Sequence, residues 1–423
     1  MEKKWMSWRG CWDYRRKDGR FENSGLCGKI MAKLVEITGK AMSGEWGFDD
    51  ETGNGIPVLR TTNFTNEGVV DYKNVVTRTI IKKNIDEKYL RPGDVIIEKS
   101  GGSDKQPVGR VVYFNGPEKT YLFNNFTGLL RVKDQTLWFP KYIFYSLYGN
   151  YRRGGTRAFE NKTTGLHNLK VDDYVSRYEI TELDHKKQIE VCEYLDKIYK
   201  VIKLREEELQ KLDDLIKARF VERFGDPILN PKGWEMVAVG DIVTDVRYGT
   251  SKPAVEGGKY PYLRMNNLTS DGHLDLKDLK YIDISDDEIE KCVVRKGDVL
   301  FNRTNSIELV GKTAVFDLPE DMVIAGYIIR VRLNEKLLPE IFSQYMNLEA
   351  IKSILRGMAK GAVNQANINA QELQSIKVYI PSMELQNQFV EMKEQVDKSK
   401  VKVQKALDET QKLFDSLMQQ YFG

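Results

Sequence analysis

Two long segments of the chain place apolar residues alternately four and three positions apart, which is the spacing of a coiled-coil seam. The first seam runs from residue 191 to 216 and the second from 392 to 417, an offset of 201. The apolar seam positions are Val191, Leu195, Ile198, Ile202, Leu209, Leu212 and Ile216 in the first segment, and Met392, Val396, Val403, Ala406, Leu413 and Leu417 in the second. Polar residues take the remaining seam positions, Arg205 in the first segment and Ser399 and Thr410 in the second. No Gly or Pro lies within either seam, so each segment is predicted to form an unbroken helix. The matching register favours packing of one helix against the other.

A different pattern fills residues 33–180 and 235–380. Short alternating runs such as Gly93–Glu98 are typical of strands, and the Gly-, Asn- and Thr-rich segments between them are typical of loops. Helical stretches are expected near 139–151 and 339–356. Each half is therefore predicted to have an α+β fold. The predicted divisions are an N-terminal extension of unknown role (1–32), a first globular domain (33–180), a first spacer helix (181–226), a second globular domain (227–380) and a second spacer helix (381–423).

The two halves repeat one ordered series of short motifs. Ile56–Arg60 matches Tyr260–Arg264 and Arg91–Ile96 matches Arg295–Leu300, both at an offset of 204; Val108-Gly109 matches Val310-Gly311 at 202, and Gln188 matches Gln388 at 200. An ordered series across a whole half predicts two copies of one domain-plus-helix unit, far longer than a solenoid repeat.

Composition narrows the class of protein. The chain has 423 residues, with 65 Lys and Arg against 62 Asp and Glu, so any nucleic-acid surface must come from local segregation of charge. The four cysteines form no CxxC pair, which predicts reduced thiols and no zinc site. No apolar run approaches the roughly 20 residues of a membrane helix. The N-terminal segment lacks the apolar core of a signal peptide. We therefore expect a cytoplasmic location and no membrane partner.

Catalytic motifs are not found in the sequence. Gly311-Lys312-Thr313 has the end of a phosphate-binding loop, but Ser306 stands where that loop requires glycine. The three histidines are scattered singly, and no HExxH or GxSxG occurs. The prediction is a chain with neither catalytic residues nor a metal site.

Local charge favours binding of DNA. Residues 141–170 contain six Lys and Arg and one acid, and the equivalent stretch of the second half is also basic and rich in Asn and Gln. Basic side chains contact phosphates, whereas Arg, Asn and Gln also read base edges. The loops after the Gly-Asp strands differ between the halves, as two readers of different sequences would require. The candidate DNA-binding residues are Arg60, Asn63, Lys99, Ser100, Arg152, Arg153, Arg157, Arg264, Asn267, Arg303, Asn305, Lys352, Arg356, Lys360 and Gln365. For Arg60 and Arg264 a structural role is an equal alternative, and the basic stretches could be ordinary solvated surface.

The chain resembles the DNA-specificity subunit of type I restriction-modification systems. The motifs that carry the resemblance are the paired Leu-Arg-x-x-Asn elements (Leu59–Asn63, Leu263–Asn267), the paired Gly-Asp-Val strands (Gly93–Val95, Gly297–Val299), and the helix entries at Gln188 and Gln388, with Ile380-Pro381 before the second. Thr181 departs from the pattern, because it stands where the second copy has Pro381.

The resemblance implies that each globular half is a target-recognition domain for one half of a bipartite double-stranded DNA target. It implies that the two helices pair antiparallel, set the spacing and dock two modification subunits. These would supply adenine-N6 DNA methyltransferase activity with S-adenosylmethionine, and restriction subunits would add an ATP- and Mg-dependent motor-nuclease. The chain itself would be non-catalytic and would bind no cofactor. Two alternatives stay open: a coiled-coil scaffold that binds protein without sequence-specific DNA binding, and a modification enzyme with an unrecognised catalytic site.

Overall fold

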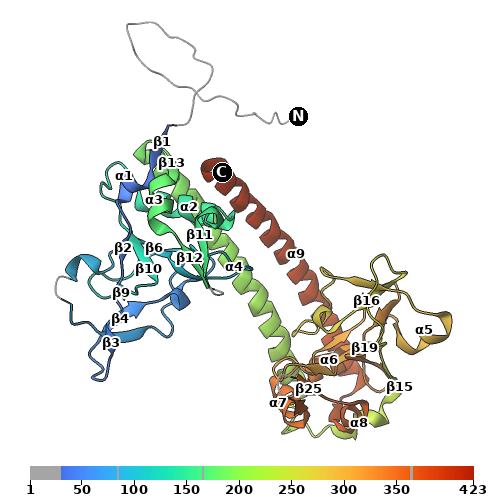
Figure 1. Cartoon of the computed structure of the whole chain (residues 1–423). Helices are drawn as coiled ribbons and strands as arrows, with labels where there is room; N and C mark the ends of the chain where they lie inside the picture. Colours follow the sequence, from blue (N-terminus) through green and yellow to red (C-terminus); the bar gives the residue numbers. More distant parts are fainter. Residues whose placement is uncertain (1–29, 83–84, 164–165, 363–364) are drawn as a thin grey trace, which may run out of the picture. The chain divides into compact units, whose positions relative to one another are not determined.

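The structure is a computed structural model that describes residues 30–82, 85–163, 166–362 and 365–423. It divides into two compact units (Figure 1). Unit 1 comprises the chain up to Lys203 together with Asp408–Gly423, and unit 2 comprises Leu204–Leu407. Each unit therefore combines one globular domain with parts of the two longest helices, α4 (His185–Phe224) and α9 (Met383–Phe422). The cysteines in the described part, Cys192 and Cys292, are buried free thiols.

The described residues of unit 1 form four small sheets. Their strand orders are β1 (Met31–Lys33) with β13 (Glu179–Thr181); β2 (Met42–Ser43), β10 (Thr127–Leu130), β6 (Val95–Glu98), β8 (Val111–Tyr113); β3 (Phe48–Asp49), β5 (Val76–Thr79), β4 (Ile56–Leu59), β9 (Leu122–Phe123); and β11 (Glu160–Thr163), β12 (Leu166–Leu169), β7 (Ser100–Gly102). The helices of its globular part are α1 (Leu34–Thr38), α2 (Pro140–Arg152) and α3 (Val171–Arg177). Strand β1 begins inside the segment that was expected to be an extension.

Unit 2 repeats these sheets. Their strand orders are β14 (Glu235–Ala238) with β26 (Lys377–Ile380); β15 (Val243–Tyr248), β23 (Ile328–Leu333), β19 (Val299–Asn302), β21 (Thr313–Val315); β17 (Lys280–Ile282), β16 (Tyr260–Leu263), β22 (Met322–Ile324), β18 (Val293–Val294); and β20 (Thr304–Asn305), β25 (Gln365–Asn367), β24 (Lys360–Ala362). Its helices are α5 (Asp286–Cys292), α6 (Pro339–Met346), α7 (Glu349–Met358) and α8 (Ala370–Ser375). The mixed helix-and-sheet fold and the internal duplication predicted from the sequence are confirmed.

The repeated Gly-Asp motif builds the same turn before each central strand. Gly93 and Gly297 have positive φ angles of 98° and 93°, a conformation that favours glycine. The following aspartate accepts a hydrogen bond from the backbone N–H of Arg91 (2.8 Å) or Arg295 (2.9 Å). Asp94 and Asp298 also pair with an arginine of the neighbouring strand region, Arg131 and Arg332 respectively. The turn fixes the entry into β6 and β19, whose residues are all buried.

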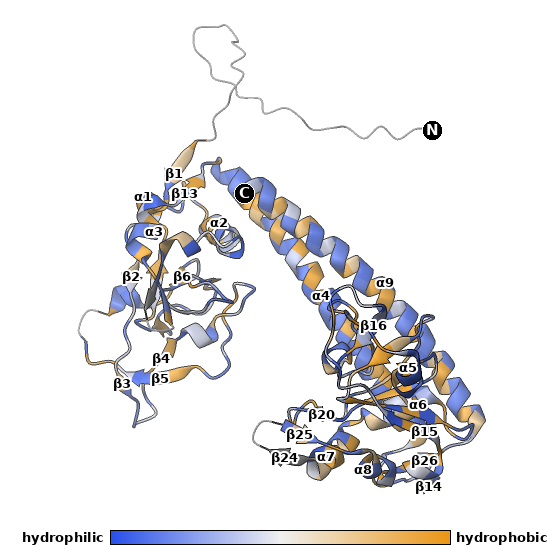
Figure 2. Cartoon of the chain, turned by 45° about the vertical axis from the view of Figure 1, so that its right-hand side comes forward, coloured by the Kyte–Doolittle hydropathy of each residue, from blue (hydrophilic) through white to orange (hydrophobic). Residues whose placement is uncertain are grey.

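Helices α4 and α9 run antiparallel within unit 2. The side-chain contacts between them join Arg205 with Ala406, Asp213 with Lys400, Phe220 with Phe389, and Arg223 with Gln388. In every pair the residue numbers add to between 609 and 613, which is the signature of antiparallel helices. Figure 2 shows hydrophobic positions recurring along both helices.

Each helix buries aromatic or sulfur-containing side chains against a domain. In unit 2, Phe220, Phe224 and Phe389 belong to the core of the globular part. In unit 1, Phe414 and Phe422 of α9 contact the rings of Tyr145 and Tyr142 on α2. Met418, which lies between them in the sequence, is also buried. These side chains, which the heptad pattern did not single out, join each helix to a domain.

The helix entries show that the predicted alignment of the two helices is wrong by a few residues. Gln188 accepts a hydrogen bond from Phe139 N (2.8 Å) and donates to Leu137 O and Leu183 O. Gln386, not Gln388, repeats this arrangement: it accepts from Leu338 N (2.9 Å) and donates to the carbonyls of Lys336 and Pro381. The offset between the helices is therefore 198. It aligns Leu183, not Thr181, with Pro381.

The corrected offset also aligns the buried positions of the helix ends. It matches Ile216 with Phe414, Phe220 with Met418 and Phe224 with Phe422, all of which are buried. Leu413 was placed in the seam, but its side chain is 51% exposed because the adjacent Phe414 takes the buried position. Of the other predicted seam residues, Val191, Leu195, Ile202 and Ile216 are buried, and Ile198, Leu209, Leu212, Met392, Val396, Val403, Ala406 and Leu417 are half-buried.

Among the described residues, no helix combines the length and the apolar character that crossing a membrane would require.

We expect Gln386→Ala to lower the free energy of unfolding by roughly 2–4 kcal/mol, because it leaves a buried N–H and two carbonyls without their partner. Gln388→Ala is the matched control. Gln388 is exposed and bonds Glu384 and Arg223, so its loss should cost within about 0.5 kcal/mol. Chemical denaturation of the two variants measures the difference. Equal destabilisation would contradict the corrected alignment.

Candidate nucleic-acid interface

Four of the predicted DNA-binding residues shape the backbone. Asn63 is buried, accepts a hydrogen bond from Arg60 N (3.0 Å) and donates to the carbonyls of Asp71 and Lys73. Asn267 is also buried and accepts from Arg264 N (2.9 Å). Both amides are occupied inside the domain, which gives Asn63 and Asn267 a structural role. That they contact DNA stays a prediction that the structure does not favour.

The arginines of the same motif also have internal partners. Arg60 Nη2 donates to Asn74 O at 3.1 Å, and Arg264 Nη2 donates to the backbone O and the carboxylate of Asp278 at 2.9 and 2.7 Å. The structure therefore favours the structural role that was the alternative for both. The Leu-Arg-x-x-Asn motif builds a turn that ends strands β4 and β16.

Arg152 and Arg153 hold the C-terminal helix of unit 1. Arg152 pairs with Asp415 at 3.0 Å, and Arg153 Nη2 donates to the carbonyl of Phe422. Both partners belong to α9, so this part of the predicted basic face also docks a helix. The assignment of Arg152 and Arg153 to DNA stays a prediction. Arg157 lies beyond this contact, in a short 3-10 helix, and is exposed.

Lys352 lies against the domain and not on an open basic face. Its Nζ donates to the carbonyl of Gly311. Burial, together with the nearby charges of Lys312 and Arg356, lowers the pKa of Lys352 to about 7. The internal bond and the lowered pKa do not favour a phosphate contact, and the assignment of Lys352 to DNA stays a prediction. Arg356 remains on the surface and pairs with Glu349, which is 82% exposed.

The remaining candidates are brought together in each unit by a three-stranded sheet. In unit 1, β7 pairs with β12 of the β11–β12 hairpin, which places Ser100 opposite Asn168. In unit 2, β20 pairs with β25 of the β24–β25 hairpin, which places Asn305 opposite Ala366 and Thr304 opposite Asn367. The loop after the Gly-Asp strand and the Asn-rich hairpin are distant in sequence, and they meet here in both copies. Figure 2 labels the three strands of unit 2.

The basic residue that precedes each of these edge strands lies at a matching position. Leu169 N donates to Lys99 O at 2.8 Å, and Ile368 N donates to Arg303 O at 2.9 Å. Lys99 Nζ donates to Ser43 Oγ at 3.1 Å, while the Arg303 guanidinium lies 5.0 Å from the ring centre of Tyr248. Both basic side chains are half-buried. We call these two assemblies, β7–β12–β11 with Lys99 and β20–β25–β24 with Arg303, the hairpin sheets.

Two further placements complete the predicted set. Gln365 is exposed at the start of β25, and Lys360 begins β24, although its side chain lies outside the described part. Asn305 donates to Asn302 Oδ1 at 2.9 Å and accepts from Ser306 N, so its amide shapes the loop that follows β20.

Sequence reasoning missed a buried acid–histidine pair in the first hairpin sheet. His167 Nδ1 lies 2.9 Å from Glu160 Oε2, and Glu160 Oε1 accepts from Val108 N at 3.1 Å. The pair joins both hairpin strands to the loop after β7. In unit 2 the position that matches His167 is Ala366, so the two hairpin sheets have different interiors on one backbone plan.

Lys312, the lysine of the phosphate-loop-like fragment, is a structural residue. Its Nζ donates to the carbonyls of Met265 and Leu268. Arg110 occupies the matching position in unit 1 and donates to the carbonyls of Thr61 and Phe64. The fragment therefore braces the turn after the strand and forms no anion cradle.

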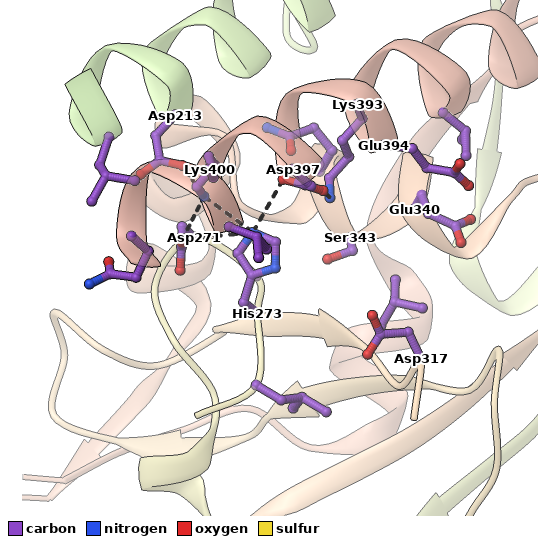
Figure 3. A pocket seen from close by; sticks show the side chains of 18 of the residues that line it. Asp213, Asp271, His273, Asp317, Glu340, Ser343, Lys393, Glu394, Asp397 and Lys400 are labelled. Atoms are coloured by element: carbon purple, nitrogen blue, oxygen red, sulfur yellow. Dashed lines mark hydrogen bonds and ion pairs between the residues drawn. The ribbon is translucent and has the colours of Figure 1, made fainter. Parts of the chain in front are cut away.

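Unit 2 also contains a cavity of about 920 Å³ between the 271–274 loop, α6 and the long helices (Figure 3). At its centre Lys400 bonds Asp213 and lies near Asp271 and Asp397. Although burial opposes the charged form, these carboxylates raise the pKa of Lys400. Six carboxylates and three lysines line the cavity, which is the wrong charge balance for DNA phosphate.

No cluster of three or more His, Cys, Asp and Glu side chains suited to a metal ion occurs in the part of the chain that the structure describes.

Comparisons with known proteins identify a family for the second half of the chain. A family model described as "Type I restriction modification DNA specificity domain" matches residues 231–410. The EcoKI type I restriction enzyme specificity subunit of Escherichia coli (strain K12) is 24% identical over 367 residues, which are 81% of this chain and 75% of that relative. Homologues and fold indicate a type I DNA-specificity subunit. A putative MjaX specificity subunit of Methanocaldococcus jannaschii is 31% identical over 166 residues, 38% of this chain and 39% of that protein.

Solved structures support the fold of this specificity subunit. The S subunit of a type I restriction-modification system from M. genitalium covers 93% of the chain with 96% of its own length, at a TM-score of 0.54 and 16% identity. A chain from a study of complex assembly and conformational transition of a type I R-M system covers 93% with 97% of its own length, at a TM-score of 0.56 and 17% identity. Both share the fold. Specificity subunits are non-catalytic, so this chain is not itself an enzyme.

We expect Lys352→Met to flatten the pH dependence of stability. The pKa of Lys352 is lower in the folded state than the ordinary 10.5, so between about pH 7 and 10.5 the unfolded chain binds more protons. Stability from this group therefore rises with pH, by about 1.4 kcal/mol from acidic conditions to pH 8. Denaturation series at pH 6, 7, 8 and 9 should show this rise in the parent chain and lose it in the variant. Parallel pH profiles for the two proteins would show that Lys352 titrates normally.

Proposed function

We propose that each globular domain of this specificity subunit reads one half of a bipartite DNA target through its hairpin sheet. The observation that carries the proposal is the repeated meeting of two sequence-distant polar segments in one small sheet, at the same place in both copies. A duplicated scaffold with equivalent edge sheets supplies two binding elements in one chain.

The two hairpin sheets share one backbone arrangement but carry different side chains. Lys99 and Ser100 in unit 1 correspond to Arg303 and Thr304 in unit 2. Arg, Asn, Ser and Thr donate or accept hydrogen bonds at base edges, and the two sets present different patterns of donors and acceptors. Different half-targets follow from one backbone plan. Exposed Arg157 would add a phosphate contact beside the first sheet.

DNA and the other subunits of a restriction-modification complex are the partners of such a chain. We propose two modification subunits, with adenine-N6 methyltransferase activity and S-adenosylmethionine, docked along α4 and α9. Restriction subunits with ATP and Mg would complete a restricting complex. The place of action would be the cytoplasm, with the DNA.

A selection experiment tests the proposal. The chain, in complex with its modification subunit, is mixed with duplexes that carry a long random segment, and bound DNA is sequenced over several rounds. We expect two defined elements separated by a gap of fixed length. The modification subunit alone is the control. Recovery of DNA without a consensus would favour the protein-binding scaffold instead.

Exchange of one domain makes the same test specific to each half. Residues 235–380, from β14 to β26, are replaced by the corresponding domain of another specificity subunit. One of the two elements should change, and the other should stay as in the parent. A change in both elements, or in neither, would contradict the division of reading between the domains.

A further inference from the structure

Each unit exposes one aromatic ring beside the basic residue of its hairpin sheet. Lys99 N donates to Phe126 O at 2.8 Å, and Arg303 N donates to Tyr327 O at 3.0 Å. The strand registers place Thr127 opposite Glu98 and Ile328 opposite Asn302, so the aromatic residues occupy matching positions just before β10 and β23. Sequence reasoning did not single out either ring.

Both aromatic residues are exposed to solvent, although burial of an aromatic side chain would stabilise the domain. Phe126 is 52% exposed and Tyr327 is 49% exposed. The other exposed aromatic residues in the described part of the chain are Phe48, Tyr72, Tyr194, Tyr248 and Tyr281. None of these has an aromatic partner at the matching position of the other unit. The positions that match the four tyrosines hold residues that are not aromatic: Leu276 for Tyr72, Met392 for Tyr194, Ser43 for Tyr248 and Thr77 for Tyr281. Strand β3, which holds Phe48, lacks a counterpart among the described strands of unit 2. The Phe126–Tyr327 pair is therefore a shared feature of the two copies.

The backbone links each ring rigidly to the proposed reading element. The carbonyl of Lys99 accepts from Leu169 of β12 while its N–H bonds the carbonyl of Phe126. Arg303 bonds Ile368 and Tyr327 in the same way. An exposed ring, a cationic side chain and a hairpin strand are thus held together by two backbone hydrogen bonds in each unit.

This combination suits DNA more than an arbitrary protein surface. An aromatic face or edge packs against a nucleobase, and a neighbouring Lys or Arg neutralises the adjoining phosphate. Both copies keep an aromatic residue and a basic residue beside the hairpin. The residue that contacts the basic side chain differs, because it is Ser43 in unit 1 and Tyr248 in unit 2.

We propose that Phe126 and Tyr327 each contact a nucleobase of the half-target read by their own domain, and that Lys99 and Arg303 contact the adjoining phosphates. The proposal rests on the proposed function, because it assigns base contacts within the same interface. It adds an apolar contact to an interface otherwise expected to be polar.

The test uses the full chain in complex with its modification subunit and the duplex target recovered by selection. Phe126→Ala should weaken binding of the target roughly 5- to 100-fold, and Tyr327→Ala should do the same. Binding to a scrambled duplex, and the slope of log K against log salt, should not change, because no phosphate contact is lost. Phe126→Tyr and Tyr327→Phe should retain binding. Phe48→Ala and Tyr281→Ala, which remove exposed rings away from the hairpin sheets, are the matched controls.

Two scans then identify the base contact. Replacement of each thymine by uracil removes a methyl group, and 2-aminopurine at each position reports unstacking by its fluorescence. Phe126→Ala should abolish the response at one position in the half-target of unit 1, and Tyr327→Ala at one position in the other. A uracil response indicates contact with a methyl group in the major groove, and a 2-aminopurine response indicates insertion between base pairs.

The outcomes separate this inference from the proposed function. If the parent complex does not distinguish the target from the scrambled duplex, the proposed function itself fails. If the parent complex is specific but the alanine variants bind like it, the aromatic contact is wrong. The aromatic contact is also wrong if the alanine variants weaken binding of scrambled DNA to the same extent, or if the control variants weaken binding of the target to the same extent. It is wrong as well if neither scan shows a response at any position of the target. A thermal melt like that of the parent shows that each variant is folded.

Discussion

The packing of the two long helices against the domain cores is the constraint on which the rest of the structure depends. In unit 2, Phe220, Phe224 and Phe389 are fully buried with Tyr379 and Tyr345 of the globular part. In unit 1, Phe414 and Phe422 lie on the tyrosines of α2, and Asp196 of α4 accepts hydrogen bonds from Tyr145 and Lys141. Burial of an aromatic side chain contributes roughly 1.5–3 kcal/mol, so several such rings hold a helix firmly. Each domain is thereby oriented on its own segments of α4 and α9.

The contact between α2 and α9 also engages basic residues that the sequence had suggested for DNA binding. Arg152 and Arg153 complete the contact between α2 and α9 by pairing with Asp415 and the carbonyl of Phe422. The hairpin sheets, in contrast, carry different side chains in the two copies, such as His167 in unit 1 and Ala366 at the matching position in unit 2.

The sequence predicted the duplication, the mixed fold and the two long helices, because each has a periodic or repeated signal. It misaligned the helices by three residues, since a seam with alternate steps of four and three nearly superimposes on itself when shifted by three. The buried amides of Gln188 and Gln386 settle the offset, and they depend on tertiary contacts with the loops before α2 and α6. The charge pattern of the sequence also could not distinguish a lysine that contacts phosphate from a lysine such as Lys352, whose partner is a backbone carbonyl. The pairing of β7 with β12 and of β20 with β25 brings together segments more than sixty residues apart, which no local pattern reveals.

We propose that the paired helices set the distance between the two half-targets. A heptad inserted after Lys203 and another after Leu407 would lie opposite each other in the antiparallel pair and leave the contacts within each unit intact. Seven residues lengthen a helix by roughly 10 Å, which is about 3 base pairs of axial rise. Selection of bound DNA with this variant, in complex with the modification subunit, should recover the same two elements with a gap longer by about 3 base pairs. A folded variant that binds with the original gap would contradict the account.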